Sequence, residues 1–166
     1  MEGPKVNSSS CVRTLQRDNE TYICLSDLAK RSNQQGETYL IQCWMSLKNT
    51  VEYLAFWERL NNTGFNDHGF EAIWKKAGLN SFVLTPEAWI RETNAIGIIS
   101  VDKRIYAHSD IAFKFACWLS VDFELFIYRE ITRLQALESP IEDAKLALHE
   151  NTLVKAIQNY IRKNNC

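Results

Sequence analysis

The chain opens with two short stretches in which apolar and polar positions alternate. "CVRTL" and "TYICL", at about residues 11–15 and 21–25, are rich in β-branched and aromatic residues, which is typical of half-buried strands. The polar segment "QRDNE" lies between them. The pattern therefore predicts an antiparallel hairpin with a five-residue loop.

A helical period replaces the alternation after the hairpin. Ser26 is placed to cap a short helix in "SDLAKRSN", with Asp27 in the first turn and basic residues in the last, where each sign of charge favours the helix dipole. Between residues 38 and 61, two apolar runs of helical spacing are separated by "KNT". Asn49 with Glu52 resembles a capping box for the second run. Two helices with a sharp joint are predicted, although one kinked helix also fits.

The middle of the chain carries clear helix boundaries. "FNDHGFEAIWKKAG" predicts a short helix that ends at Gly78, and "SFVL" is a possible strand. "TPEAWIRETN" begins with Thr85 as a suitable N-cap and Pro86 in the first helical position, and Asn94 is a plausible end.

A second hairpin and two long helices are expected next. "GIIS" and "RIYA" flank "VDK", which predicts two very short strands and a tight turn. Ser109 with Asp110 is placed to cap a helix that is apolar almost all round and so should be central. Another helix follows from Phe123 to about Glu138, and Pro140 ends it.

The final segment has a separate amphipathic pattern. Apolar residues recur at helical spacing across residues 144–161, and such a helix is marginal by itself, so it must pack on the core or on a partner chain. The predicted organisation is a flexible tail at residues 1–10, a domain at residues 11–138 and a helical extension at residues 139–166. The fold class is α+β, predominantly helical with an N-terminal hairpin.

Composition limits the class of protein. A chain of 166 residues with 46% hydrophobic residues can bury one core. Its five cysteines show no CxxC spacing, which favours reduced thiols. No apolar run approaches the roughly 18 residues of a membrane-spanning helix. We therefore expect no membrane contact and a cytoplasmic location, or a nuclear one in a eukaryotic cell.

Charge allows only a local basic surface. The whole chain has a net charge of −1, and residues 11–138 contain 14 Lys and Arg against 16 Asp and Glu, so strong electrostatic binding of nucleic acid by the whole fold is not expected. Basic and polar side chains nevertheless group at three places, and for each group solvated surface charge is the alternative explanation. The groups are Lys48 with Asn49 and Thr50 in the helix joint, Lys75 with Lys76, and Lys103 with Arg104 in the second turn.

The sequence offers little for catalysis or metal binding. It has no glycine-rich phosphate loop, no G-x-S-x-G and no metal-ligand pair at the usual spacing. A zinc site joining His108, Cys117 and Cys43, and a nuclease using Asp110 with Asp122 or Glu124, are remote alternatives. No enzyme activity and no cofactor are expected. Of the tryptophans, Trp57 is expected to be half-exposed and the other four to pack in the core.

Four long segments carry a family resemblance. "YICLSDLAK", "WMSLKNTVEYLAFWERLNN", "GLNSFVLTPEAWIRETNAIGI" and "YAHSDIAFKFACWLSVDFELFIYREITRLQ" together resemble a KilA-N domain over roughly residues 11–138. The resemblance implies a DNA-binding module related to the APSES domain, with a winged helix-turn-helix-like core, of the kind found in phages, bacteria, large DNA viruses and some eukaryotes. It also adds Tyr106 and His108, from the "YAH" block, to the candidate DNA-binding residues.

Two departures from the family pattern weaken the expected phosphate contacts. Family members commonly carry a glycine-containing basic loop such as "GRYGGT" before the "YAH" block, whereas this chain has only "VDKR". They also often have Lys where this chain has Glu87. The first change removes backbone amides that approach phosphate closely, and the second reverses a charge.

Two functions therefore remain open at the level of sequence. One is duplex DNA binding, dominated by the phosphate backbone, in a regulatory role such as transcription. The other is protein interaction or homodimerisation through residues 144–161, on a fold whose DNA binding has weakened.

Overall fold

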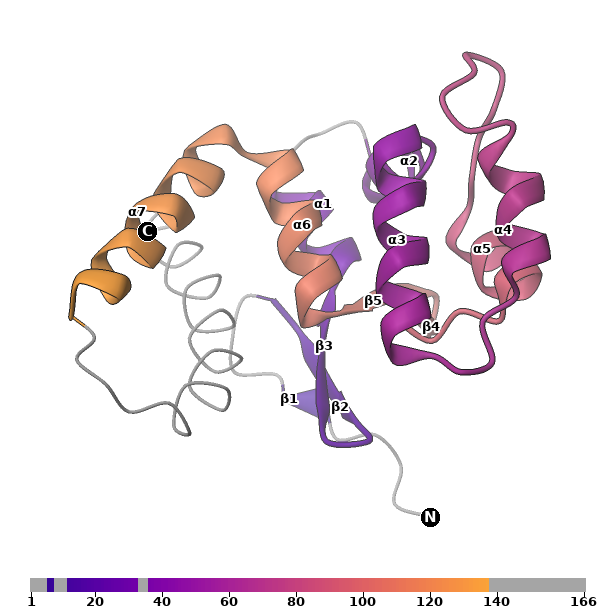
Figure 1. The fold of residues 1–166 in the computed structure, drawn as a ribbon. Coiled ribbons are helices and arrows are strands. Elements are labelled where there is room, and N and C mark those ends of the chain that lie inside the picture. The colour runs from indigo at the N-terminus through magenta and orange to yellow at the C-terminus, as the bar shows by residue number, and fades with distance from the viewer. Residues whose placement is uncertain (1–5, 8–11, 33–35, 138–166) are drawn as a thin grey trace.

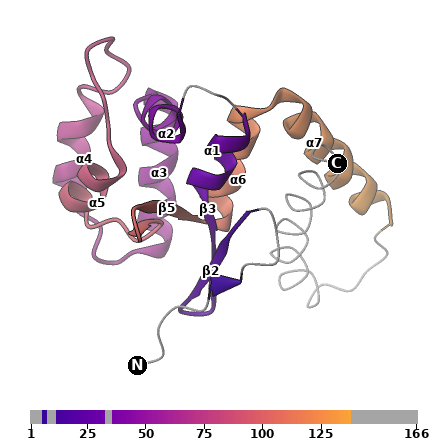
Figure 2. The same ribbon diagram turned by 180° about the vertical axis from the view of Figure 1, so that it is seen from behind.

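The computed structural model describes residues 6–7, 12–32 and 36–137. Within them a five-stranded antiparallel sheet, with strand order β1-β2-β3-β5-β4, packs against helices through β3, β4 and β5, which confirms the α+β class. In Figure 1 and Figure 2, α4 and α5 lie beyond α3 on one side of the molecule, and α7 projects from α6 on the other side. The strands are β1 (Val6–Asn7), β2 (Thr14–Arg17), β3 (Glu20–Cys24), β4 (Ile98–Val101) and β5 (Arg104–His108). The helices are α1 (Leu25–Ser32), α2 (Glu37–Met45), α3 (Lys48–Asn61), α4 (Asp67–Trp74), α5 (Pro86–Thr93), α6 (Ser109–Leu119) and α7 (Val121–Leu137).

The ends of the chain bear on the predicted organisation. Val6–Asn7 pairs with β2 as strand β1, so these two residues of the predicted N-terminal tail belong to the sheet, and the rest of residues 1–10 lies outside the described residues. The predicted helical extension at residues 139–166 lies outside the described residues. No helix in the described ranges has the length and apolar character needed to cross a bilayer.

Both hairpins close through two-residue turns. β2 and β3 remain paired as far as Arg17 and Glu20, and only Asp18 and Asn19, with φ of 53° and 66°, form the turn. The predicted five-residue loop was therefore wrong. Asp and Asn tolerate the left-handed conformation that such turns require, so the pairing extends to the end of the polar segment.

The first helix begins earlier than predicted. Leu25 is already helical, and Ser26 does not cap the helix; its Oγ accepts a hydrogen bond from the Ile105 amide of β5 at 3.1 Å. Asp27 accepts hydrogen bonds from the backbone and guanidinium of Arg13. This pairing holds the pKa of Asp27 below its ordinary value, although burial of the carboxylate opposes the shift. The side chains of Ser26 and Asp27 thus both bond to partners outside α1.

The predicted sharp joint between two helices is confirmed at residues 46–47. Asn49 is not the cap, because α3 begins at Lys48 with Leu47 in the N-cap position. The capping box was wrong as well, since Glu52 instead accepts a hydrogen bond from the indole of Trp74 at 2.8 Å. The carboxylate thereby ties α3 to α4.

The segment between α4 and α5 contains one wrong prediction and one confirmed helix start. "SFVL", residues 81–84, is a loop rather than a strand. Thr85 caps α5 by accepting from the Ala88 amide at 3.1 Å, and Pro86 occupies the first helical position. Asn94 ends the helix in the left-handed conformation, with φ of 54°. Thr85, Pro86 and Asn94 therefore occupy the positions that the local rules predict.

The core joins the sheet to the helices, and α6 is central as predicted. His108 rather than Ser109 caps α6, because its ring nitrogen Nδ1 accepts from the Asp110 amide. Two tryptophan predictions were wrong, since Trp57 is 8% exposed and Trp118 is 40% exposed. The largest fully buried side chains include Trp44, Trp89, Phe115, Phe123 and Leu54.

A buried carboxylate organises the connection between α5 and β4. Glu58 is fully buried and accepts hydrogen bonds from the amides of Ile96 and Gly97 and from the side chain of Asn62, at 2.8–3.1 Å. A Cβ at Gly97 would lie only 2.6 Å from the ring of Trp57, so this approach requires glycine. The second hairpin therefore begins at a position set by α3.

Candidate nucleic-acid interface

The joint between α2 and α3 is fastened to the loop between α4 and α5. Ser46 Oγ donates to the carbonyl of Gln42 at 2.7 Å and accepts from the Leu84 amide at 2.8 Å. The Ser46 carbonyl accepts from the amide of Gly78 at 3.0 Å. Both ends of the loop are thus held against the joint, which brings residues 75–84 beside the start of α3.

Lys48 lies at this junction with its direction set by an aromatic ring. Its Nζ is 4.0 Å from the ring centroid of Trp74, a cation–π contact that leaves the exposed ammonium at the N-terminal end of α3. None of the described side chains caps that end. Its first amides and the lysine therefore together form an electropositive surface of the kind that attracts phosphate.

The two residues after Lys48 differ in accessibility. Asn49 is exposed and continues the surface. Thr50, however, is only 4% exposed and packs inside the molecule. Its side chain is not available to a ligand on this surface.

Lys75 and Lys76 extend the same surface from the end of α4. Both are exposed, and they begin the loop that Ser46 anchors. No Asp or Glu occurs from residue 72 to residue 86. The structure thus gathers Lys48, Asn49, Lys75 and Lys76 into one group, which we call the joint surface.

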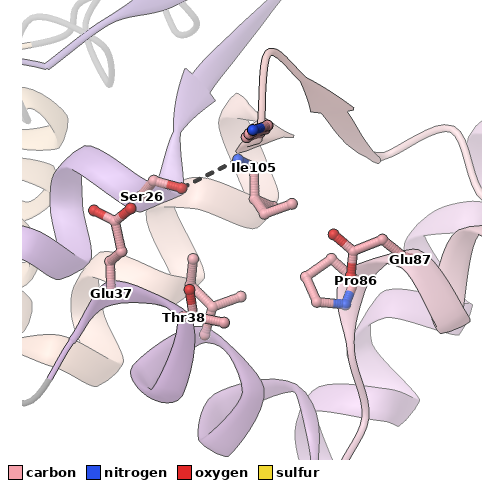
Figure 3. A pocket seen from close by; sticks show the side chains of 8 residues that line it. Ser26, Glu37, Thr38, Pro86, Glu87 and Ile105 are labelled. Atoms are coloured by element: carbon pink, nitrogen blue, oxygen red, sulfur yellow. Dashed lines mark hydrogen bonds between the residues drawn. The ribbon is translucent and has the colours of Figure 1, made fainter.

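Lys103 and Arg104 occupy a different place. Lys103 has a φ of 61° in the β4–β5 turn and lines a pocket of about 70 Å³ with Glu37 and Glu87. Figure 3 shows these two carboxylates on opposite sides of the pocket, one from α2 and one from α5. Its volume is far below the ~300 Å³ typical of small-molecule sites. Two carboxylates thus line the same pocket as the exposed Lys103, and Arg104 beside it is half-buried.

The two basic groups lie at opposite ends of α2. The pocket contains Glu37 and Thr38 from the first turn of the helix, whereas Ser46 of the joint follows its last turn. A nine-residue helix is about 13 Å long. The predicted residues thus form two separate groups. The loop of the joint surface contains no acidic residue, although Glu52 of α3 is bonded to the Trp74 indole that Lys48 contacts, whereas Lys103 shares its pocket with two carboxylates.

Tyr106 and His108 lie inside the fold. They are 4% and 5% exposed, and Tyr106 packs with Leu15, Tyr22 and Cys24 in a small apolar cluster. The ring of His108 packs against that of Trp57, with centroids 4.9 Å apart. Their side chains support the sheet and the start of α6, and do not reach the surface.

His108 also lies between two carboxylates. Its Nε2 is 3.1 Å from Glu20 and its Nδ1 is 3.4 Å from a carboxylate oxygen of Asp110. Burial disfavours the charged ring, but the hydrogen bonds to Asp110 and Glu20 outweigh that effect and raise the pKa above its ordinary value. A protonated His108 would therefore link β3 to the start of α6 through both carboxylates, whereas only the neutral ring, with Nδ1 unprotonated, accepts from the Asp110 amide.

The described residues contain no group of three His, Cys, Asp or Glu side chains suited to a metal ion. Two residues of the remote zinc hypothesis, Cys43 and Cys117, are free thiols. Asp110 of the nuclease hypothesis accepts from the indole of Trp57 at 3.1 Å. Its carboxylate thus already has a structural role in connecting α3 to α6.

Sequence reasoning missed the residues that assemble the joint surface. Ser46 and Trp74 hold Lys48 and the loop in place, and Leu79 and Val83 are more than half exposed beside them. A serine after a helix and aliphatic residues in a loop carry no distinctive sequence pattern. The one available indication was the absence of acidic residues between Trp74 and Glu87.

Comparison with known proteins gives one match. The sequence model of the KilA-N domain matches residues 6–137, most of the chain. Neither the curated proteins nor the solved structures contain a match.

Proposed function

This chain belongs to the KilA-N family, which is generally a family of DNA-binding domains, and we propose that it binds duplex DNA mainly through the phosphate backbone, in a regulatory role. The observation that carries the proposal is the joint surface. There three exposed lysines and the uncapped start of α3 come together beside a loop that has no acidic residue.

The chemistry of the joint surface suits phosphate. Lysines neutralise backbone charges and release counterions, while helix N-terminal amides donate hydrogen bonds to a phosphate oxygen at close range. Asn49 adds a neutral donor on the same surface. These contacts position a protein on a duplex without reading its sequence.

The β4–β5 turn is a weaker contact in this proposal. The turn contains two residues instead of a glycine-rich loop, and Lys103 shares its pocket with Glu37 and Glu87. Neighbouring carboxylates reduce the attraction of a lysine for phosphate. We therefore assign the main phosphate contacts to the joint surface, and a secondary one to Lys103 and Arg104.

Binding of a labelled duplex as a function of salt concentration tests the proposal. The wild-type affinity should fall steeply as salt rises. Replacing Lys75 and Lys76 together with alanine should weaken binding and reduce the slope of log affinity against log salt by about one for each phosphate that the variant no longer neutralises. Arg129→Ala on α7 removes one exposed positive charge away from the joint surface, and should leave the slope unchanged.

Two results would contradict the proposal. One is no change in duplex mobility with micromolar protein at low salt. The other is an equal loss of affinity in the lysine variant and the Arg129→Ala control, because such a loss would reflect net charge rather than a site.

A second candidate function is protein interaction, favoured by a row of exposed apolar residues on α7. Val121 is 76% exposed, Leu125 48% and Tyr128 60%. Their spacing of four and three residues places them on one side of the helix, as in a coiled-coil seam. A partner helix, for example residues 144–161 of a second copy, is the occupant that this seam fits.

Light scattering distinguishes this second candidate. The full chain should have the mass of a dimer, and Leu125→Asp should lower it to that of a monomer because a charge is costly in an apolar seam. If deletion of residues 140–166 leaves the measured oligomeric state unchanged, those residues are not the dimerisation element.

A further inference from the structure

The loop between α4 and α5 is the most prominent projection near the joint surface. In both Figure 1 and Figure 2 it extends beyond the ends of α2 and α4. Its base is fixed by the hydrogen bonds from Gly78 and Leu84 to Ser46, and Leu84 is 2% exposed. The Phe82 amide donates to the Leu79 carbonyl at 2.9 Å, which closes a turn at the tip. The loop therefore presents a defined tip on an anchored stem.

Exposed aliphatic side chains flank the polar residues at the tip of the loop. Leu79 is 58% exposed and Val83 is 61% exposed, and the exposed polar residues Asn80 and Ser81 lie between them in sequence. Two large aliphatic side chains on a projecting turn gain free energy when a partner covers them. The tip is thus a candidate contact surface.

Charge indicates which kind of partner fits. Lys75 and Lys76 begin the loop, Lys48 lies beside its base, and the loop contains no acidic residue. Glu52 is the acidic residue bonded beside the base of the loop, through the Trp74 indole. A tip with exposed aliphatic side chains above three lysines is complementary to a polyanion with an apolar interior, and stacked base pairs between two phosphate backbones have that character. Proteins that bind the minor groove use the same combination of basic residues and an inserted aliphatic wedge.

We propose that the tip of this loop enters the minor groove of duplex DNA, where Leu79 and Val83 wedge a base step while the lysines hold the flanking phosphates. This inference rests on the proposed DNA binding and adds that the bound duplex is bent. Wedging unstacks one step and kinks the duplex by about 20–90°. Flexible steps such as TA should therefore be preferred, because they are the least costly to unstack.

The experiment uses the full chain and a duplex of about 20 base pairs with fluorophores at both ends and 2-aminopurine beside a central TA step. Wild-type protein should bring the ends closer and increase the 2-aminopurine emission. Leu79→Ala and Val83→Ala should each abolish most of the bending and most of the increase in 2-aminopurine emission. Each should also weaken binding on the order of tenfold, because it truncates an aliphatic side chain that the duplex would bury. Their salt slope should stay unchanged because the lysines remain.

A matched control and two further outcomes separate this inference from the proposed function. Leu60→Ala truncates an exposed leucine at the opposite end of α3 and should behave like wild type. Wild-type binding without bending, or full bending by Leu79→Ala, overturns the wedge and leaves DNA binding intact. A wild-type chain that fails to bind the duplex at low salt overturns both.

Discussion

Single buried polar residues hold the irregular segments of this fold. Glu58 satisfies two backbone amides and the Asn62 side chain where α5 passes into β4. His108 caps α6 and contacts Glu20 of β3. In each case one side chain replaces hydrogen bonds that a regular element would provide.

Replacing Glu58 with glutamine should therefore be costly. The substitution removes the charge from two amide hydrogen bonds and turns an NH₂ donor toward one of those amides, so the free energy of unfolding should fall by about 2–3 kcal/mol. Urea unfolding followed by circular dichroism measures the change. Glu71→Gln, on the exposed side of α4, should alter the midpoint little. Equal effects of the two variants would disprove the role of Glu58.

His108 should make stability depend on pH. Its pKa is raised in the folded state above the ordinary value of 6.5, so the protonated ring contributes stability that is complete below that value. This contribution is lost as pH rises through the folded pKa. The stability advantage of wild type over His108→Asn, which retains a capping acceptor, should thus be larger at a pH below 6.5 than at a pH above the raised folded pKa. An equal stability difference between wild type and His108→Asn at the two pH values would exclude the effect.

Among the elements, the β4–β5 hairpin combines regular pairing with a strained turn. Four residue pairs join the strands, from Ile98 with Ala107 to Val101 with Arg104. Asp102 and Lys103 both have positive φ, with values of 49° and 61°. A lysine in this region costs free energy that glycine does not. The β4–β5 turn therefore has a lysine, Lys103, at a left-handed position where glycine would be less strained.

Lys103→Gly and Lys103→Ala separate the charge of this residue from its conformation. Both remove the ammonium, but only glycine relieves the left-handed strain, so the glycine variant should be more stable than the alanine variant by ~1 kcal/mol. If Lys103 contacts phosphate, both variants should show the same weakening of duplex binding. A glycine variant no more stable than the alanine variant would contradict the strain.

At the scale of the whole molecule, the core formed by the described residues lies between Val12 and Ile127. One cluster joins the sheet to the helices, and a smaller one lies between Leu15, Tyr22, Cys24 and Tyr106. The joint surface and the row of apolar residues on α7 both lie outside these clusters. The two proposed contact surfaces thus lie on a single folded domain, outside its buried clusters.

A chain truncated after residue 138 should therefore still unfold in a single cooperative transition. The expected result is coincident unfolding curves from tryptophan fluorescence and far-ultraviolet circular dichroism, because both core clusters remain. Its duplex affinity should match that of the full chain, since the joint surface is intact. Separate transitions for the two probes would show that the two core clusters do not unfold as one cooperative unit.

The sequence by itself determined the elements whose rules are local. Thr85, Pro86 and Asn94 specified α5. The interrupted apolar pattern between residues 38 and 61 predicted a joint, and the structure places it at residues 46–47, between two helices rather than within one kinked helix. Apolar periodicity made α6 central. Four matching segments also identified the family without reference to the fold, a resemblance that the match over residues 6–137 confirms. Such features depend on neighbours within a few positions, so sequence is sufficient.

Only the tertiary structure decided where polar side chains find their partners. Three residues that looked like helix caps have other roles. Ser26 accepts a hydrogen bond from the Ile105 amide, and Glu52 accepts one from the Trp74 indole. At the start of α6, His108 is the cap in place of Ser109. The grouping of Lys48 with Lys75 and Lys76 likewise depends on Ser46, which anchors a loop more than 30 residues away. A hydrogen bond between distant segments leaves no periodic trace in the sequence, because its partners meet only after the core has formed.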